Sequence, residues 1–70
     1  GGTVCPAMNG ANEEAVALFL ADKIGFYDIY RLVAQAVEQV PFIQNPTLEE
    51  ILEADHLARQ AVRKCREVLV

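Results

Sequence analysis

The hydrophobic pattern of the chain is dominated by an unbroken run of seven apolar residues, 15–21, which follows a mostly polar stretch. Ala and Leu dominate the run, so a helix is favoured over a strand. A helix that is apolar on every side must be buried on every side. We therefore predict a first helix over about residues 4–21, with Thr3 as its N-cap, and expect residues 15–21 to form the buried centre of the domain. Gly10 is a weak point inside this helix, at a cost of about 1 kcal/mol relative to Ala.

A second helix is predicted over about residues 27–40, after a turn that Gly25 is expected to supply at the end of the first helix. Its apolar positions recur every three or four residues, which is typical of an amphipathic helix. They are Ile29, Leu32, Val33, Ala36, Val37 and Val40. The opposite face is polar, so this segment is expected to be a surface helix with one buried side.

The segment between Pro41 and Pro46 is the one clear loop in the sequence, because the two prolines prevent a helix from continuing. We expect the apolar residues Phe42 and Ile43 to pack back onto the helices rather than face water. This loop separates the second helix from a third.

The third helix is expected to begin with a capping box, in which the side chains of Thr47 and Glu50 each accept a hydrogen bond from the other's backbone N–H. It is predicted over about residues 48–69. Acidic residues lie near its start and basic residues near its end, so the charge asymmetry of the chain complements the helix dipole. Its buried stripe is expected to comprise Leu48, Ile51, Leu52, Ala54 or Asp55, Ala58, Val62, Cys65 and Leu69. The pattern therefore predicts an all-α domain of three helices.

Length and composition narrow the class of protein. A chain of 70 residues forms one small domain at most, and its stability is marginal without reinforcement. The apolar fraction of 53% is high for this size, so some apolar surface is expected to serve a partner. The net charge of −4 argues against nucleic acid, whose phosphates favour a basic surface. The longest apolar run falls far short of the about 20 residues that cross a bilayer, so no membrane association is predicted.

Asp55 is the most interesting carboxylate, because it lies on or beside the apolar stripe of the third helix. A buried acid without a partner is costly, so we expect it to bond the start of the first helix or a loop N–H. A catalytic acid or a metal ligand is the alternative. His56, Cys5 and Cys65 are the possible soft metal ligands, but they lack the close spacing of zinc sites. The two thiols are expected to be reduced and to pack as small buried groups.

Asn9 and Asn12 lie three residues apart and therefore share a helix face. They are expected either to bond Asp55 or to face another domain. Glu13 and Glu14 are adjacent and point in different directions, so they do not form an acid–base pair. The residues alone predict no catalytic, cofactor-binding or metal-binding side chain. Asn9, Asn12 and Asp55 are the structural or interdomain candidates.

Three segments of the chain resemble one known family. They are GGT, PAMNGANE and AVALFL within residues 1–20, IGFYDI at residues 24–29, and PTLEEILEADHLAR at residues 46–59. In the same order, they are similar to the GGT…P…LNAANE.AV..FL, I.F.DI and PSLE.VL.AD..AR segments in the C-terminal helical domain of 1-deoxy-D-xylulose 5-phosphate reductoisomerase. The departures are Met8 for the usual Leu, Gly10 for the usual Ala, and Leu57 where Trp is common.

The resemblance implies three helices that form most of a four-helix bundle, whose first helix precedes this chain. Gly1 and Gly2 would then act as a helix stop. It also implies a parent enzyme, an oxidoreductase and isomerase of the non-mevalonate isoprenoid pathway. That enzyme converts 1-deoxy-D-xylulose 5-phosphate to 2-C-methyl-D-erythritol 4-phosphate with NADPH and Mg or Mn, in the bacterial cytoplasm and as a homodimer. None of the family's cofactor, metal or phosphate motifs maps onto these residues, so the fragment alone is expected to be inactive.

The implied partners are the upstream catalytic and NADPH-binding domains of the same polypeptide, which this segment would brace as a non-catalytic scaffold. A missing helix and a high apolar fraction together predict an uncovered apolar groove, through which the fragment self-associates. One alternative is a free-standing helical protein-interaction module. Another, a small acidic helical regulator, has only the net charge in its favour.

Overall fold

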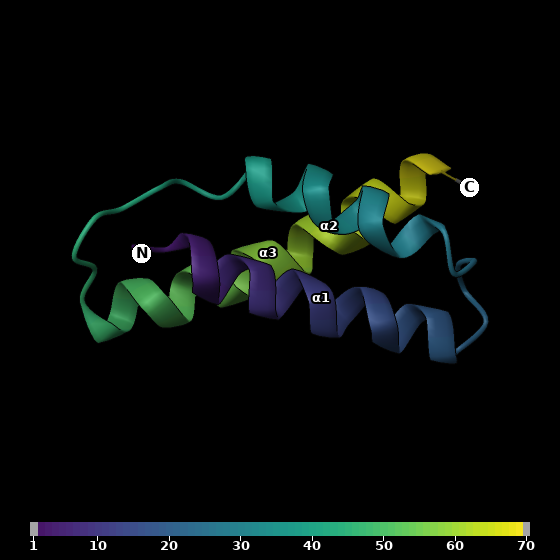
Figure 1. The fold of residues 1–70 in the computed structure, drawn as a ribbon, viewed down its shortest axis with the longest axis horizontal. Helices are drawn as coiled ribbons and strands as arrows, with labels where there is room; N and C mark the ends of the chain where they lie inside the picture. Colours follow the sequence, from purple (N-terminus) through teal and green to yellow (C-terminus); the bar gives the residue numbers. More distant parts are fainter. Residues whose placement is uncertain (1, 70) are drawn as a thin grey trace.

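The computed structural model describes residues 2–69, and the side chains of residues 2–68. It contains three α-helices, α1 (Val4–Leu20), α2 (Asp28–Glu38) and α3 (Leu48–Leu69). Residues 2–69 form no strand, so the prediction of an all-α fold with three helices is confirmed. Figure 1 shows α1 and α3 running in the same direction, with α2 antiparallel to both. The observed helix ends lie within two residues of the ranges expected from the sequence.

The core between the three helices is built mostly from small side chains. Each helix contributes a stripe of buried residues: Ala7, Ala11 and Ala15 from α1, Leu32, Val33 and Ala36 from α2, and Ala58, Ala61, Val62 and Cys65 from α3. Small residues allow helix axes to approach closely. Gly10 is also buried, and a Cβ atom there would lie 2.7 Å from the backbone oxygen of Asp55. The glycine that seemed a weak point is therefore where α1 and α3 pack backbone to backbone.

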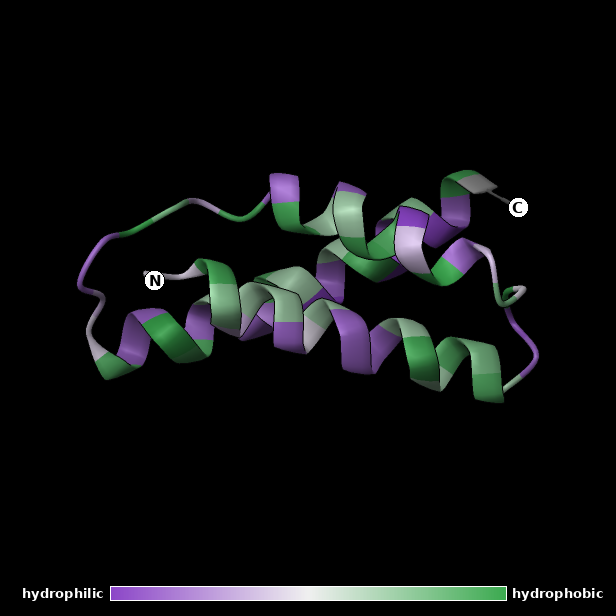
Figure 2. Cartoon of the chain, viewed as in Figure 1, coloured by the Kyte–Doolittle hydropathy of each residue, from purple (hydrophilic) through white to green (hydrophobic). Residues whose placement is uncertain are grey.

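The expectation that residues 15–21 are buried on every side is wrong. Ala15 is fully buried, but Val16 is exposed and Leu20 is 76% exposed. The physical reason is that, among residues 2–69, only α2 and α3 pack against α1, so its outer surface stays uncovered whatever its composition. Figure 2 shows hydrophobic residues continuing around the last turns of α1.

The buried stripe predicted for α3 is also wrong near its start. Leu48 is 71% exposed and Leu52 is exposed as well, whereas the later stripe residues Ala54, Ala58, Val62 and Cys65 are buried. The 11 residues of α2 span only about 16 Å at 1.5 Å per residue, so α2 cannot cover the full length of α3. The side chain of Leu69, also predicted for this stripe, lies outside the described residues.

The turn after α1 forms without glycine at its left-handed position. Asp22 takes that position with φ 60°, and the N–H groups of Asp22 and Lys23 donate to the carbonyls of Phe19 and Leu18. This pair of bonds is the Schellman pattern of helix C-termini. The expectation that Gly25 ends α1 is therefore wrong. Its N–H donates instead to the Asp28 carboxylate at 2.8 Å, at the start of α2.

Thr3 does not cap α1, contrary to expectation. Its φ of −87° and ψ of −1° are helical, whereas a capping residue needs an extended backbone. Its hydroxyl instead donates to the carbonyl of Pro41 at 2.9 Å and accepts from the N–H of Ile43 at 2.9 Å. The backbone N–H of Thr3 donates to the carbonyl of Ile43 at 3.1 Å. The start of α1 is thereby tied to the loop that follows α2.

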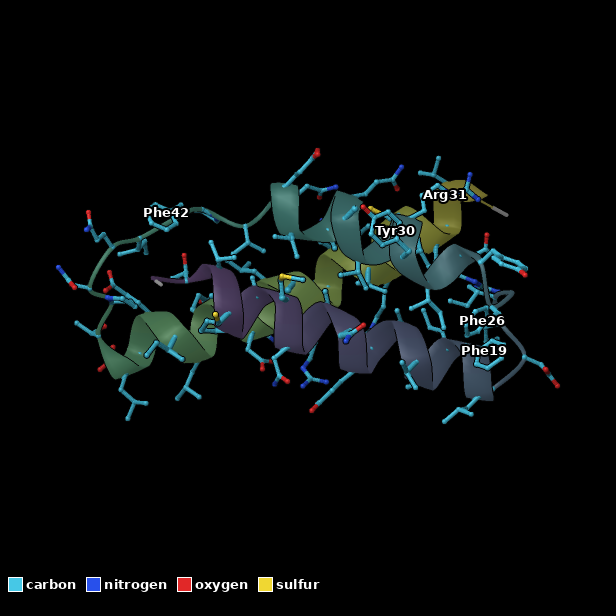
Figure 3. All side chains as sticks on the ribbon, viewed as in Figure 1. Phe19, Phe26, Tyr30, Arg31 and Phe42 are labelled. Carbon is cyan, nitrogen blue, oxygen red and sulfur yellow. The ribbon has the colours of Figure 1, made fainter. Side chains whose placement is uncertain are left out.

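The loop between α2 and α3 packs back onto the bundle only in part. Ile43 is half-buried, but Phe42 is exposed, so the expectation for Phe42 is wrong. Figure 3 shows its ring beside this loop. Gly2, at φ 60°, leaves room for the ring edge, which a Cβ atom would approach to 2.8 Å. Gly1 lies outside the described residues, so the helix stop expected at Gly1-Gly2 stays a prediction.

The capping box at the start of α3 is confirmed. The N–H of Thr47 donates to Oε1 of Glu50 at 2.9 Å, and the N–H of Glu50 donates to the Thr47 hydroxyl at 3.1 Å. These two bonds satisfy backbone groups that have no partner within the helix. The box explains why α3 begins only two residues after Pro46.

Candidate functional site

Asp55, the sequence-predicted candidate on α3, is half-buried and bonded to Arg59 one turn further along the same helix. Nε of Arg59 donates to Oδ1 of Asp55 at 2.5 Å, and Nη2 of Arg59 donates to Glu13 on α1 at 2.6 Å. The expectation that Asp55 bonds the start of α1 or a loop N–H is therefore wrong. The carboxylate is neutralised within α3, and Arg59 then links α3 to α1.

Arg59 is held as a cation by this arrangement. The hydrogen bonds to Asp55, and then to Glu13, raise the pKa of Arg59 above its usual range. Neighbouring opposite charges favour the charged form of a group. A guanidinium shared between two carboxylates on different helices can hold α1 and α3 together.

A second ion pair lies further along the same two helices. Nε of Arg63 donates to Oε2 of Glu14 at 2.9 Å, and this contact raises the pKa of Arg63. Sequence analysis assigned the basic end of α3 to the helix dipole and missed its pairing with α1. Part of the signal was present, because Arg59 and Arg63 lie four residues apart and so share a face of α3.

Asn9 and Asn12, the other two candidates, lie on the exposed surface of α1. In the part of the chain that the structure describes, neither side chain bonds Asp55, whose partner is Arg59. That interpretation of the two amides is therefore wrong. Both border a shallow pocket together with Val16 and Leu20 on the outer face of α1. Their role as interdomain contacts stays a prediction.

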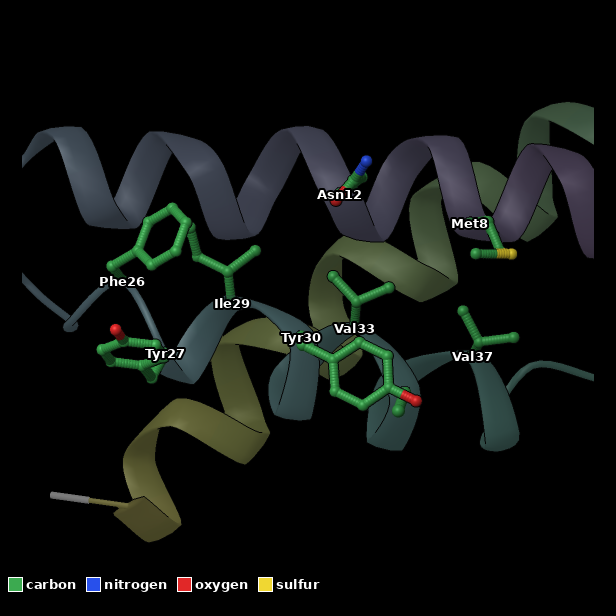
Figure 4. A pocket seen from close by; sticks show the side chains of 9 residues that line it. Met8, Asn12, Phe26, Tyr27, Ile29, Tyr30, Val33 and Val37 are labelled. Carbon is green, nitrogen blue, oxygen red and sulfur yellow. The ribbon is translucent and has the colours of Figure 1, made fainter.

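An apolar groove with a volume of about 530 Å³ lies between α1 and α2. Figure 4 shows Met8 and Asn12 of α1 on one wall and side chains of α2 on the other. The residues that shape it include Met8, Asn12, Phe26, Tyr30, Val33 and Val37. Its lining is almost entirely hydrocarbon, which suits an apolar side chain better than a charged or phosphorylated ligand.

The two cysteines were both expected to be buried, and only Cys65 is. Cys65 is buried and accepts a hydrogen bond from the side chain of Gln39 at 3.4 Å, whereas Cys5 is exposed. Both are free thiols. Among residues 2–69, no group of three or more His, Cys, Asp or Glu side chains could hold a metal ion. No helix of the described chain is long and apolar enough to cross a membrane.

The family described as "DXP reductoisomerase C-terminal domain" matches residues 1–61 of the chain. The chain belongs to this family. Relatives named 1-deoxy-D-xylulose 5-phosphate reductoisomerase include the protein of Aquifex aeolicus, strain VF5, which is 49% identical over 67 residues. That alignment covers 96% of this chain and 18% of the relative.

Two Synechococcus reductoisomerases show the same relationship. The protein of strain CC9311 is 48% identical over 91% of this chain and 16% of its own length. The protein of strain JA-2-3B'a(2-13) is 50% identical over 86% of this chain and 15% of its own length. The chain therefore spans less than a fifth of the length of these curated relatives. The family assignment made from the sequence motifs is confirmed.

Proposed function

We propose that this chain is the non-catalytic C-terminal scaffold of a 1-deoxy-D-xylulose 5-phosphate reductoisomerase. In this proposal, the parent enzyme uses NADPH and Mg or Mn to isomerise and reduce its substrate to 2-C-methyl-D-erythritol 4-phosphate in the bacterial cytoplasm. The segment itself braces the catalytic and NADPH-binding domains of the same polypeptide. The names of its relatives and the match to the C-terminal domain family support this proposal.

The observation that carries the scaffold role is the bonding of Asp55. This is the one carboxylate of the predicted apolar stripe, and it is engaged by Arg59 at 2.5 Å, which also reaches Glu13 at 2.6 Å. Asp55 is thus engaged within α3, and the same arginine joins α3 to α1. The donor set needed for a divalent cation, three or more carboxylates or other ligands, does not assemble among residues 2–69. We therefore place the metal and NADPH on the remainder of the parent enzyme.

The test is a chimera of the Aquifex aeolicus reductoisomerase in which this chain replaces the segment that is 49% identical to it. NADPH oxidation with the substrate and thermal unfolding are measured on the same preparation. The chimera is expected to retain turnover, since a scaffold contributes fold rather than chemistry. A folded chimera without turnover would contradict the proposal.

Three variants of the chimera test whether the candidate residues have a structural or a catalytic role. Asp55→Ala is expected to lower thermal stability before it lowers turnover, because Arg59 loses its partner on α3. Asn9→Ala and Asn12→Ala test the exposed amides of α1, and each is likewise expected to affect thermal stability before turnover. Loss of turnover at unchanged stability in any of them would assign that residue to the catalytic machinery instead.

A free-standing helical interaction module is the second candidate function. It is favoured by the open apolar groove, which is lined by side chains such as Met8 and Tyr30. Large exposed apolar patches mark interaction surfaces. The coding sequence upstream of this segment decides between the two candidates, because only a reductoisomerase would continue into catalytic and NADPH-binding domains.

A further inference from the structure

The dipeptide Asn9-Gly10 joins an exposed side chain to a buried piece of backbone within α1. Asn9 is exposed, whereas Gly10 is buried against α3. The chain contains three asparagines, at residues 9, 12 and 45. Glu13 follows the second and Pro46 follows the third. Asn9 is therefore the one asparagine that precedes a residue without a Cβ atom.

This pair of residues can react with itself. The backbone nitrogen of Gly10 forms a bond to Cγ of Asn9 and gives up its proton, while the bond from Cγ to the side-chain nitrogen breaks and ammonia leaves. The product is a cyclic imide, and water opens it at either carbonyl to give aspartate or isoaspartate at residue 9. Glycine favours ring closure because it has no side chain to hinder it. Proline excludes the same reaction at Asn45, since its nitrogen carries no proton.

The folded chain keeps the two reacting atoms apart. Both residues lie inside α1, so the N–H of Gly10 belongs to the hydrogen-bond ladder of the helix. The helix also tilts the Asn9 side chain toward its N-terminus, away from the nitrogen of the next residue. Ring closure requires the backbone of Asn9 to leave its helical conformation. That rotation would pull Gly10 away from Asp55, against which it packs without room for a Cβ atom.

We propose that Asn9-Gly10 is a self-modification site that converts local opening of α1 into a permanent chemical change. Each opening frees the nitrogen of Gly10, so the rate of modification follows the fraction of molecules in which this part of α1 is open. Asn12 is an internal reference, because it is exposed on the same helix but is followed by Glu13, whose side chain hinders ring closure.

The products fit α1 poorly, so the modification opposes closure of the helix. Isoaspartate adds a methylene to the main chain directly before Gly10, where α1 and α3 lie side by side with their backbones in contact (Figure 1). The regular hydrogen bonds of a helix cannot continue across this extra atom. Aspartate at residue 9 places a negative charge four residues before Glu13, and like charges at this spacing destabilise a helix.

The test is incubation of the 70-residue chain in mildly alkaline buffer, with and without guanidinium chloride. Circular dichroism confirms the folded and unfolded states, and mass spectrometry of peptides measures the conversion of each asparagine to acid. In the unfolded chain, Asn9 is expected to convert several times faster than Asn12. In the folded chain, conversion at Asn9 is expected to be slower by about tenfold or more, which corresponds to an opening free energy of at least about 1.4 kcal/mol.

Two variants test the chemistry and the opening separately. Gly10→Ala in guanidinium chloride is expected to lower the conversion at Asn9 toward that at Asn12, because the added methyl group hinders ring closure. Arg59→Gln removes the link between α3 and Glu13 of α1, so it is expected to speed conversion at Asn9 in buffer but not in guanidinium chloride. Lys64→Gln, which removes an exposed charge from α3, is the control and should match the wild type.

Three results would overturn the proposal. Equal conversion of Asn9 in the folded and unfolded chains would show that α1 gives no protection. Equal conversion of Asn9 and Asn12 in the unfolded chain would show that Gly10 does not create a reactive site. A purified modified chain that melts at the same temperature as the unmodified chain would show that the products do not oppose closure of α1.

Discussion

Gly10 of α1 faces the backbone of Asp55 on α3, with the position of a Cβ atom only 2.7 Å from the Asp55 carbonyl oxygen. Real Cβ atoms do not approach so closely, and a backbone oxygen cannot turn aside as a flexible side chain can. The spacing of α1 and α3 is therefore set by the absence of a side chain at residue 10. The same contact brings Asp55 to the place where Arg59 and Glu13 meet.

Gly10→Ala is expected to lower the free energy of unfolding by about 1 kcal/mol. Overpacking costs about 1–3 kcal/mol, while the better helix propensity of Ala recovers up to about 1 kcal/mol. The contact is with a backbone oxygen, so α3 as a whole has to move away from α1, and the helix propensity of Ala offsets only part of that cost. Urea unfolding measures the change. Gly25→Ala is the control, since its Cβ would contact only a flexible side chain at 3.3 Å.

Thr3→Val is expected to lower the free energy of unfolding by about 1–2 kcal/mol. The side chain keeps its volume but loses the hydroxyl, so the N–H of the half-buried Ile43 loses its partner, whereas water can replace the bond to the carbonyl of the exposed Pro41. Thr3→Ser keeps the hydroxyl and should cost less than about 1 kcal/mol. Equal losses in the two variants, measured by urea unfolding, would show that packing matters here and not these hydrogen bonds.

Asp22→Gly is expected to raise the free energy of unfolding by about 0.5–1 kcal/mol. A left-handed backbone costs an L-residue about 1–2 kcal/mol, and glycine avoids this cost but gains freedom in the unfolded chain. Thermal unfolding gives the sign directly. Lys23→Gly, one residue later and without a positive φ, is expected to have the opposite effect.

Arg59→Gln is expected to lower the melting temperature more than Arg63→Gln. Arg59 serves two carboxylates, including the half-buried Asp55, whereas Arg63 serves Glu14 alone. Added salt should reduce the difference in melting temperature between the two variants, because dissolved ions screen exposed ion pairs. Lys64→Gln, which removes an exposed charge from the same helix, is the control. Equal melting temperatures for the two Arg variants would contradict the role given to Asp55.

The stability of the chain is expected to depend on the charge of Asp28 in acid. The N–H of Gly25, and then Arg31, lower the pKa of Asp28 below its usual value of 3.8. A carboxylate with a depressed folded-state pKa stabilises the fold above its unfolded pKa, and this contribution is lost as the pH falls through the folded pKa. Asp28→Asn should therefore be less stable than the wild type near neutral pH, and the difference should shrink as the pH falls through the folded-state pKa of Asp28.

Urea unfolding across a pH series checks this expectation. Glu67→Gln is the matched control, because Glu67 is exposed on α3 and far along the sequence from Gly25 and Arg31. It should follow the wild-type profile. If the free energy of unfolding of Asp28→Asn differs from that of the wild type by the same amount at every pH, the ionisation of Asp28 does not contribute to stability.

The helices themselves could be predicted because they depend on local chemistry. The spacing of Leu32, Val33 and Ala36, and the reciprocal bonds of Thr47 and Glu50, act between residues one helical turn apart. The family motif was equally local, since its residues follow each other in the sequence. Nothing beyond neighbouring residues was needed for these predictions.

The candidate site was predicted less well, because its contacts join distant parts of the chain. Asp55 was selected correctly as a residue beside the core, but its partner was assigned to the wrong element. Arg59 was overlooked as a link between helices. Its bond to Glu13 spans 46 positions, and no periodic pattern within one helix reveals which face of another helix will meet it.

The amino-acid sequence by itself determined that this protein forms three helices, where they begin and end to within a turn, and which family they belong to. Tertiary structure alone decided which apolar residues are covered, because coverage depends on the number and length of neighbouring helices. Leu20 and Leu48 stay exposed for that reason, although both are apolar and are spaced along their helices as core residues are. Tertiary structure also decided the role of Thr3. Its hydroxyl bonds two loop residues that lie 38 and 40 positions away in the sequence, and only folding brings these groups within hydrogen-bonding distance.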